Sequence, residues 1–342
     1  MMRATVIYGT ALAVLLALSW WQWTAEPEVD RGDKVELLAG KAEAITEIRW
    51  TGKKNESTLT RRSDAVGPYF WVDYTRWTQK PVLKTQGEEE DGSPIEPTPP
   101  ERVAKQSVFK ASDKAEELLK SLSPMLALRR LDVTGPDKIS EIGLDVPEAT
   151  LEIVRGDSTQ VLDIGGEAYG SRHIYVRRRS DGQIYLVERE LLQNLKYARS
   201  RLADHSLVGT ARKDVTRAVL TAEGETLEAT QRNPHDAAKA VWVLASDPEN
   251  APEQLTTWMA QALKLKGMRY ADPAAPPVDL ESRLTLQLFD AKGRSETLEL
   301  LQVGQSGDWY ARSEHTRGLV KVVRSAAKSL ADDVGSVIES AD

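Results

Sequence analysis

Alternating apolar and polar positions between residues 149 and 196 give the clearest structural signal in the chain. Four short runs alternate in this way, at residues 150–154, 160–164, 173–177 and 183–187. A period of two residues predicts half-buried β-strands, and the Asp181-Gly182 dipeptide between the last two runs is typical of a tight hairpin. A helix is predicted next, because apolar residues recur at helical spacing at Leu191, Leu192 and Leu195. We therefore predict an antiparallel meander followed by a helix.

A second set of predicted elements precedes this meander. Alternation predicts strands at residues 45–50, 57–61 and 68–74, and the last of these is rich in aromatic residues. The helix predicted after them has its apolar residues on one face, at Ala115, Leu118, Leu119 and Leu122. Pro124 ends or kinks this helix.

The same series of elements returns in the C-terminal part of the chain. Predicted strands occur in the same order at residues 215–220, 240–244, 283–288, 297–300, 309–312 and 321–323. Predicted helices begin at Pro252 and at Ala326. Recurrence in one order indicates duplication. We predict an α+β fold with two repeated units of antiparallel β-meanders packed with helices, over residues 25–205 and 206–342.

The N-terminal segment predicts a membrane anchor. Residues 4–23 carry no charge, and such a run is long enough to cross roughly 30 Å of hydrocarbon as a helix. Aromatic residues suited to the membrane interface close it, at Trp20, Trp21 and Trp23. Arg3 precedes the run and acidic residues follow it, which places the N-terminus inside. We expect a single-pass transmembrane helix over residues 1–24 in the inner (cytoplasmic) membrane, with the bulk of the chain on the periplasmic or extracytoplasmic side.

A cleaved signal peptide is the alternative for this segment. Residues 17–19 offer a cleavage site of the small-x-small type. Cleavage there leaves Trp20 and Trp21 at the new terminus, and the apolar run is long for a signal core. We therefore favour the retained anchor.

The stretch from residue 86 to residue 101 differs from the rest of the chain. It holds six acidic residues, four prolines and no basic residue. Such a sequence cannot bury apolar area, so we expect a solvated, acidic, Pro-rich insertion within the first unit. A binding role for the acidic run is the less favoured interpretation.

Composition excludes several classes of site. The net charge of −7 argues against a general nucleic-acid binder. The absence of Cys removes disulfides, thiolate metal sites, Fe–S clusters and Cys nucleophiles. The four histidines lack metal-binding spacing, and neither a Gly-x-Ser-x-Gly motif nor a phosphate loop is present. We predict no enzymatic activity, no catalytic residues, no metal and no cofactor.

One basic segment is a candidate binding site. Only three carboxylates lie between residues 171 and 201, but eight basic residues do. The basic residues are Arg172, Arg177, Arg178, Arg179, Arg189, Lys196, Arg199 and Arg201. This arginine strip is suited to an anionic lipid, an acidic glycan or an acidic protein partner. The other interpretation, which we favour, is a solvated sheet face whose arginines pair with nearby carboxylates.

Several motifs resemble a known family. They comprise Ile142-Gly143-Leu144-x-x-Pro147, then Leu162-x-Ile164-Gly165, then Tyr175-Val176-Arg177, a Gly-bearing turn, and Ile184-Tyr185-Leu186-Val187. In this pattern the chain resembles domain-of-unknown-function family 4340, over most of its length beyond the anchor. The second unit lacks the Ile-Gly-Leu-x-x-Pro segment.

The resemblance implies a function without implying catalytic residues. Members are typically anchored in the inner membrane of the bacterial envelope and are often encoded beside ABC-type transporter subunits of the gliding-motility or auxiliary-transport kind. We therefore expect a non-catalytic accessory or scaffold subunit of an envelope complex, with an ABC-type permease and ATPase as partners. The alternative is an extracytoplasmic binding module that uses the arginine strip; an envelope hydrolase has the least support.

Overall fold

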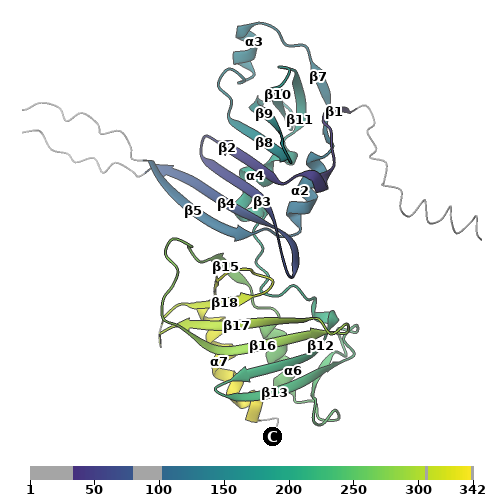
Figure 1. Ribbon diagram of the computed structural model, residues 1–342, viewed down its shortest axis with the longest axis vertical. Coiled ribbons are helices and arrows are strands. Elements are labelled where there is room, and N and C mark those ends of the chain that lie inside the picture. Colours follow the sequence, from purple (N-terminus) through teal and green to yellow (C-terminus); the bar gives the residue numbers. More distant parts are fainter. Residues whose placement is uncertain (1–33, 80–101, 305–306, 340–342) are drawn as a thin grey trace, which may run out of the picture.

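Two large antiparallel sheets form the framework of the protein (Figure 1). The computed structural model describes residues 34–79, 102–304 and 307–339. The first sheet has nine strands in the order β5-β4-β3-β2-β8-β9-β10-β11-β7. They are β2 (Glu47–Gly52), β3 (Asn55–Asp64), β4 (Gly67–Gln79), β5 (Arg102–Lys110), β7 (Arg129–Leu131), β8 (Ala149–Arg155), β9 (Ser158–Glu167), β10 (His173–Arg178) and β11 (Ile184–Glu188).

The second sheet has eight strands in the order β14-β13-β12-β16-β17-β18-β19-β15. They are β12 (Val215–Ala222), β13 (Glu225–Arg232), β14 (Val241–Leu244), β15 (Gly267–Tyr270), β16 (Leu280–Asp290), β17 (Ser295–Val303), β18 (Trp309–Ser313) and β19 (Val320–Val322). A separate short pair joins β1 (Val35–Leu38) to β6 (Met125–Ala127).

Helices pack against each sheet. The first sheet carries α2 (Lys114–Leu122), α4 (Glu190–Lys196) and α5 (Ala198–Arg201), and the second carries α6 (Glu253–Ala262) and α7 (Arg324–Glu339). The short helix α3 (Pro136–Glu141) belongs to the first lobe but buries none of its residues. Short 3₁₀ turns form η1 (Ala42–Ala44) and η2 (Arg212–Asp214). We call the first sheet with α2 to α5 the first lobe, and the second sheet with α6 and α7 the second lobe.

The two sheets follow one topology. Reading outward from the central pair, β2 and β8 of the first sheet occupy the places of β12 and β16 in the second. In both sheets the strand before the central meander lies at the far edge, as β7 and as β15. The difference is β5, which adds an outer strand to the first sheet and has no counterpart in the second.

The predicted α+β fold class is wrong, because the described chain is mostly antiparallel β-sheet. Strand β4 spans 13 residues and β5 spans 9, whereas α4 spans only 7. Alternation is missing from the sequence of β5 because that strand is at the edge of the sheet, where only its last two residues are buried. The described chain therefore has more strand than the alternation of its residues predicts.

The predicted membrane anchor over residues 1–24 lies outside the described residues, with its tryptophans Trp20, Trp21 and Trp23. Among the residues that the structure does describe, no helix is both long and apolar enough to cross a membrane. The acidic insertion at residues 86–101 also lies outside the described ranges.

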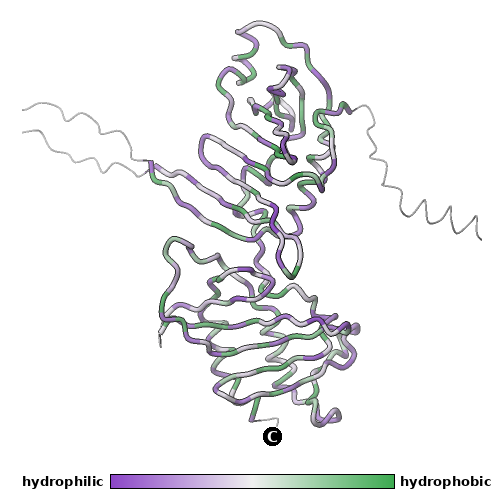
Figure 2. Tube along the Cα trace, in the orientation of Figure 1, coloured by the Kyte–Doolittle hydropathy of each residue, from purple (hydrophilic) through white to green (hydrophobic). Residues whose placement is uncertain are grey.

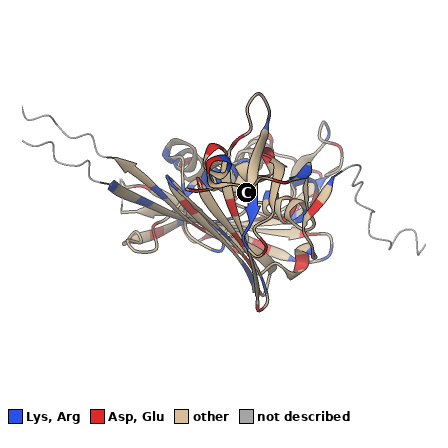
Figure 3. Ribbon diagram, turned by 90° about the horizontal axis from the view of Figure 1, so that it is seen from above, with Lys and Arg blue, Asp and Glu red and all other residues tan. Residues whose placement is uncertain are grey.

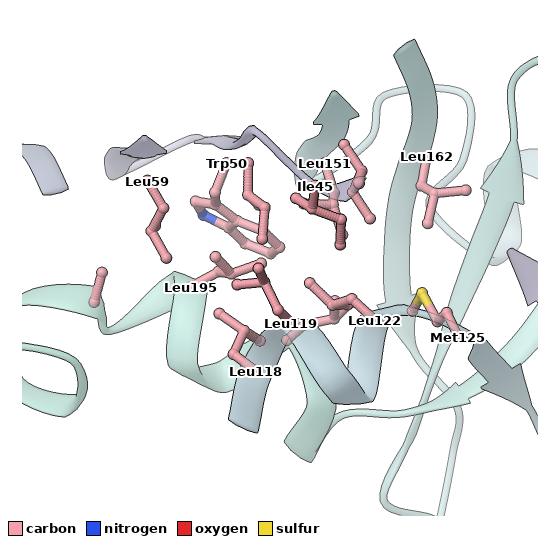
Figure 4. Close-up of a cluster of buried hydrophobic side chains, with 14 of the residues drawn as sticks. Ile45, Trp50, Leu59, Leu118, Leu119, Leu122, Met125, Leu151, Leu162 and Leu195 are labelled. Atoms are coloured by element: carbon pink, nitrogen blue, oxygen red, sulfur yellow. The ribbon is translucent and has the colours of Figure 1, made fainter. Parts of the chain in front are cut away.

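Each lobe has its own apolar core between its sheet and its helices. In the first core, Leu118, Leu119 and Leu122 of α2 face Leu151 of β8 and Trp50 of β2 (Figure 4). The strands show the corresponding alternation of apolar and polar positions along the trace (Figure 2). Burying a Leu side chain contributes roughly 2 kcal/mol, so these clusters hold the helices on the sheets.

The second core is closed by two tryptophans. Trp242 of β14 is completely buried, and Trp258 of α6 donates its indole N–H to the carbonyl of Leu330 in α7 at 3.0 Å. This bond joins the two helices of the second lobe. Aromatic burial and a satisfied N–H together favour this packing over a purely aliphatic contact.

The motif residues near Gly143 and Gly165 meet in space. Gly166 donates its N–H to the carbonyl oxygen of Ile142 at 2.8 Å, and Leu144 is completely buried. A Cβ at Gly165 would lie only 2.6 Å from that same carbonyl oxygen. Gly143 has a φ of +68°, a conformation that favours glycine. Glycine is therefore required where the segment after α3 crosses β9.

Replacing Gly165 by Ala should lower the free energy of unfolding by about 2 kcal/mol, because the added methyl group overpacks against backbone that cannot move away. Gly335 in α7 is the matched control, since nothing lies within 4 Å of its would-be Cβ. Gly335→Ala should stabilise by about 0.5 to 1 kcal/mol through helix propensity. Urea denaturation of the full-length protein measures both. Equal effects of the two substitutions would contradict the close crossing.

Candidate functional site

A large cleft separates the two lobes. Its volume is about 1580 Å³. The first lobe supplies residues 104–109 of β5, the turn between β2 and β3, and the α4–α5 region. The second lobe supplies β15 and the loop after it, at residues 271–277. We call this space the interlobe cleft.

The interlobe cleft is basic although the chain is acidic overall. Nine Lys or Arg residues line it, against four Asp or Glu residues, in a protein whose net charge is −7. Seven of the nine cations make no side-chain hydrogen bond or ion pair within the described ranges: Lys53, Lys54, Arg76, Lys105, Lys196, Arg199 and Arg269. Because no described carboxylate forms an ion pair with them, their positive charge is available to attract an anionic ligand into the cleft.

Strand pairing and helix capping position these cations. Lys105 of β5 lies opposite Arg76 of β4 in the strand register. Helix α4 is held at its C-terminal end by β3, where Ser57 Oγ donates to the carbonyl of Leu195 at 3.2 Å and Asn55 Nδ2 donates to that of Lys196. Side-chain donors satisfy carbonyls that a helix end leaves free. This end of α4 therefore presents its last turn to the cleft.

A buried ion pair lies at the junction of the lobes. The Nζ of Lys110 is 2.6 Å from Oδ2 of Asp204, and their side chains are only 8% and 9% exposed. His315 of the second lobe donates from Nε2 to the same Oδ2 at 2.7 Å, since a carboxylate accepts only. The cluster thus joins the end of β5, the chain segment between the lobes and the β18–β19 turn.

The pKa of Asp204 is held below its ordinary value. Burial alone raises it, but hydrogen bonds from His315, from Lys110 and from the N–H of Ser206 favour the charged carboxylate and outweigh burial. Nearby Tyr270 has a raised pKa, first because it is buried and second because the Asp204 charge disfavours a phenolate. Asp204 is therefore charged and Tyr270 neutral near pH 7.

A second contact joins the lobes at the β3–β4 hairpin. Arg317 Nε donates to Oδ2 of Asp64 at 2.9 Å, and its guanidinium lies 4.7 Å from the ring centroid of Tyr69. Trp71 meets Tyr270 edge to face with ring centroids 5.7 Å apart. Hydrogen bonds from Arg317 lower the pKa of Asp64.

Most of the arginine strip is paired with carboxylates, as the solvated-face interpretation predicts. Arg177 and Arg179 both bind Asp163, whose side chain is 1% exposed. Arg178 pairs with Asp181 and also donates to the carbonyl of Leu37 at 2.7 Å. The remaining pairs are Arg189 with Glu167 and Arg201 with Glu190.

Three members of the strip line the interlobe cleft, namely Arg189, Lys196 and Arg199. Lys196 Nζ lies 6.0 Å from the ring centroid of Tyr197. Arg172 has no side-chain partner among the described residues, and it is not a cleft residue. The structure therefore divides the strip between a paired sheet face and one wall of the cleft.

Other basic residues of the cleft were missed by sequence reasoning. Arg76 and Lys105 lie opposite each other on the neighbouring strands β4 and β5, whereas Arg269 comes from β15 of the second lobe. No sequence spacing connects them, because strand pairing brings Arg76 to Lys105 and only the junction of the lobes brings Arg269 to that pair. Figure 3 shows basic positions on the ribbon of β4 and β5 that projects from the body of the molecule. Within the described ranges, no cluster of His, Asp and Glu is arranged to hold a metal ion.

Comparison with known proteins gives a family. The family model "Domain of unknown function (DUF4340)" matches residues 102–279. The chain belongs to this family. The matched segment of the DUF4340 protein begins at β5 and ends just after β15 and its loop, so it contains the main strands on both walls of the cleft. No curated protein and no solved structure matches the chain.

Asp204→Ala should lower the free energy of unfolding by about 3 kcal/mol, because it leaves the buried Lys110 ammonium without its partner. Asp332→Ala is the control: it removes an exposed pair with Lys328 and should change stability by less than about 0.5 kcal/mol. Chemical denaturation at pH 7 measures both. A small effect for Asp204→Ala would contradict the role of the buried pair.

The same carboxylate predicts a pH dependence. Its folded-state pKa is depressed, so its stabilisation is fully present above the unfolded pKa of about 3.9 and is lost as pH falls below it. As the pH falls from about 5 to about 3, the free energy of unfolding of the unsubstituted protein should decrease by more than that of the Asp204→Ala variant. Parallel acid-side slopes would show that Asp204 is not ionised in the folded state.

Proposed function

We propose that this protein is a non-catalytic accessory subunit of a bacterial envelope complex that holds an anionic part of its partner in the interlobe cleft. The observation that carries the proposal is a set of cations that face one large cleft in an acidic protein and have no side-chain partner among the described residues. Complementary charge of this kind speeds association and selects the partner. The paired arginines of β10 are weaker candidates, because carboxylates already neutralise them.

The partner class follows from the family resemblance and from the N-terminal sequence. An ABC-type permease and ATPase are the partners that the resemblance implies. The uncharged run at residues 4–23 supports a place at the cytoplasmic membrane, with the two lobes on its extracytoplasmic side. An anionic lipid or glycan in the same cleft is the second candidate, favoured by the same cations.

The test is purification of the full-length protein from crosslinked native membranes, followed by mass spectrometry. We expect recovery of a permease and an ATPase with the native chain. Recovery should fall at least fivefold when Lys105→Glu and Arg269→Glu are combined, because reversed charges repel an anionic partner. The control is Lys213→Glu, an exposed lysine outside the cleft, which should leave recovery unchanged.

Three outcomes would separate the alternatives. Recovery of transporter subunits that does not depend on the cleft charges would contradict the proposed site. The protein coming out alone, while vesicles of anionic lipid bind it in a cleft-dependent way, would favour the second candidate. If neither transporter subunits nor anionic-lipid vesicles bind, both candidate functions are wrong.

A further inference from the structure

The outer edge of β5 is an unfilled place in the first sheet. In an antiparallel strand the N–H and C=O of one residue point to the same side, and successive residues alternate. Ala111, just after β5, donates its N–H to the carbonyl of Phe70 in β4 at 2.8 Å. The odd-numbered residues of β5 therefore direct their backbone N–H and C=O groups toward β4. The backbone groups of Ala104, Gln106, Val108 and Lys110 face away from the sheet.

The chain itself already pairs with this edge at one end. The segment between the lobes runs antiparallel to the end of β5 and pairs Ala203 with Ala111. Ser112 N–H donates to the carbonyl of Leu202 at 2.8 Å, and Asp204 N–H donates to that of Lys110 at 3.0 Å. The edge is thus already extended at its C-terminal end.

This short paired segment stops where the cleft begins. After Asp204 the chain turns to the second lobe, where the carbonyl of His205 accepts from the N–H of Gly267 at 2.9 Å. Beyond that point the outward backbone groups of Val108, Gln106 and Ala104 have no backbone partner within the described ranges. Residues 104 to 109 all line the cleft in succession, as they do when a strand presents its edge.

Cations surround this open edge. Lys105 and Arg76 project from neighbouring strands in register, and Lys54 lies beside them, with its carbonyl accepting from the N–H of Trp77 at 3.0 Å. Arg269 stands on the opposite wall. In a strand added here, every second side chain would lie on one face of the sheet. Carboxylates at alternate positions match this surface.

We propose that an extended acidic segment of a partner protein adds to the edge of β5, continuing the line that residues 202–204 begin. This inference rests on the proposed function, since it names the chemistry that the interlobe cleft recognises. Backbone hydrogen bonds to Ala104, Gln106 and Val108 give affinity, and the surrounding cations select acidic sequences. Open strand edges pair readily with other chains, so the lysines also keep two copies of the protein from pairing here.

The first test uses peptides as probes. A library of ten-residue peptides has Glu at every second position and any amino acid at the remaining positions. Its members are screened for binding to the full-length protein in detergent by fluorescence anisotropy. The best binder is then made with N-methyl groups on one alternating set of amides or on the other. We expect one set to weaken binding at least about tenfold and the other less than twofold, because only one side of an added strand faces β5. Equal losses, or no binder in the library, would overturn the proposal.

The second test uses the protein. Gln106→Pro removes the outward N–H, and an edge strand tolerates proline at such a position. Gln106→Ala keeps the N–H and is the matched control. We expect at least a tenfold loss of peptide affinity for the first and less than twofold for the second, with equal thermal unfolding of both variants. Should Gln106→Pro fold poorly, the methylated peptides decide the question alone.

The proposed function and the strand addition can fail separately. If Lys105→Glu with Arg269→Glu abolishes partner recovery while Gln106→Pro leaves it intact, the proposed function holds and strand addition is wrong. Polyanionic glycan or anionic-lipid vesicles that bind equally well to Gln106→Pro would likewise rule out strand addition. If neither substitution affects recovery, the cleft is not the site.

Discussion

The edges of the two sheets determine how this protein is arranged. A sheet edge carries backbone groups that require partners or water, and the segment at residues 202–205 connects two such edges by pairing first with β5 and then with β15. The buried ion pair of Lys110 and Asp204 lies where this segment leaves β5, and His315 of the second lobe completes it. Because both lobes contribute to one charged cluster, this cluster fixes the position of one cleft wall relative to the other.

The two lobes differ mainly at one sheet edge. Their strands follow the same order from one edge to the other, apart from β5. This extra strand belongs to the segment that the family model matches, and it supplies one wall of the cleft. A topology used twice thus carries the additional outer strand only once. The second sheet ends instead at β14, the edge opposite to β15.

The sequence predicted local structure better than it predicted the site. The hairpin at Asp181-Gly182 is confirmed, with Val176 opposite Tyr185 and Arg177 opposite Ile184, because alternation and turn chemistry both act over a few residues. Strand β5 was missed because an exposed edge strand lacks alternation. The arginines at 177–179 stood out as a run, yet their partners Asp163 and Asp181 occupy other positions of the same meander. Lys105 and Arg269 are isolated in sequence and meet only through the packing of the lobes.

Amide hydrogen exchange of the full-length protein, purified alone and within its native complex, tests the central claim most directly. It reports whether the backbone of β5 gains hydrogen-bond partners when the complex forms. We predict that the amides of Ala104, Gln106 and Val108 exchange rapidly in the isolated protein and at least tenfold more slowly in the complex. Unchanged exchange along β5, with new protection on another surface, would contradict the account.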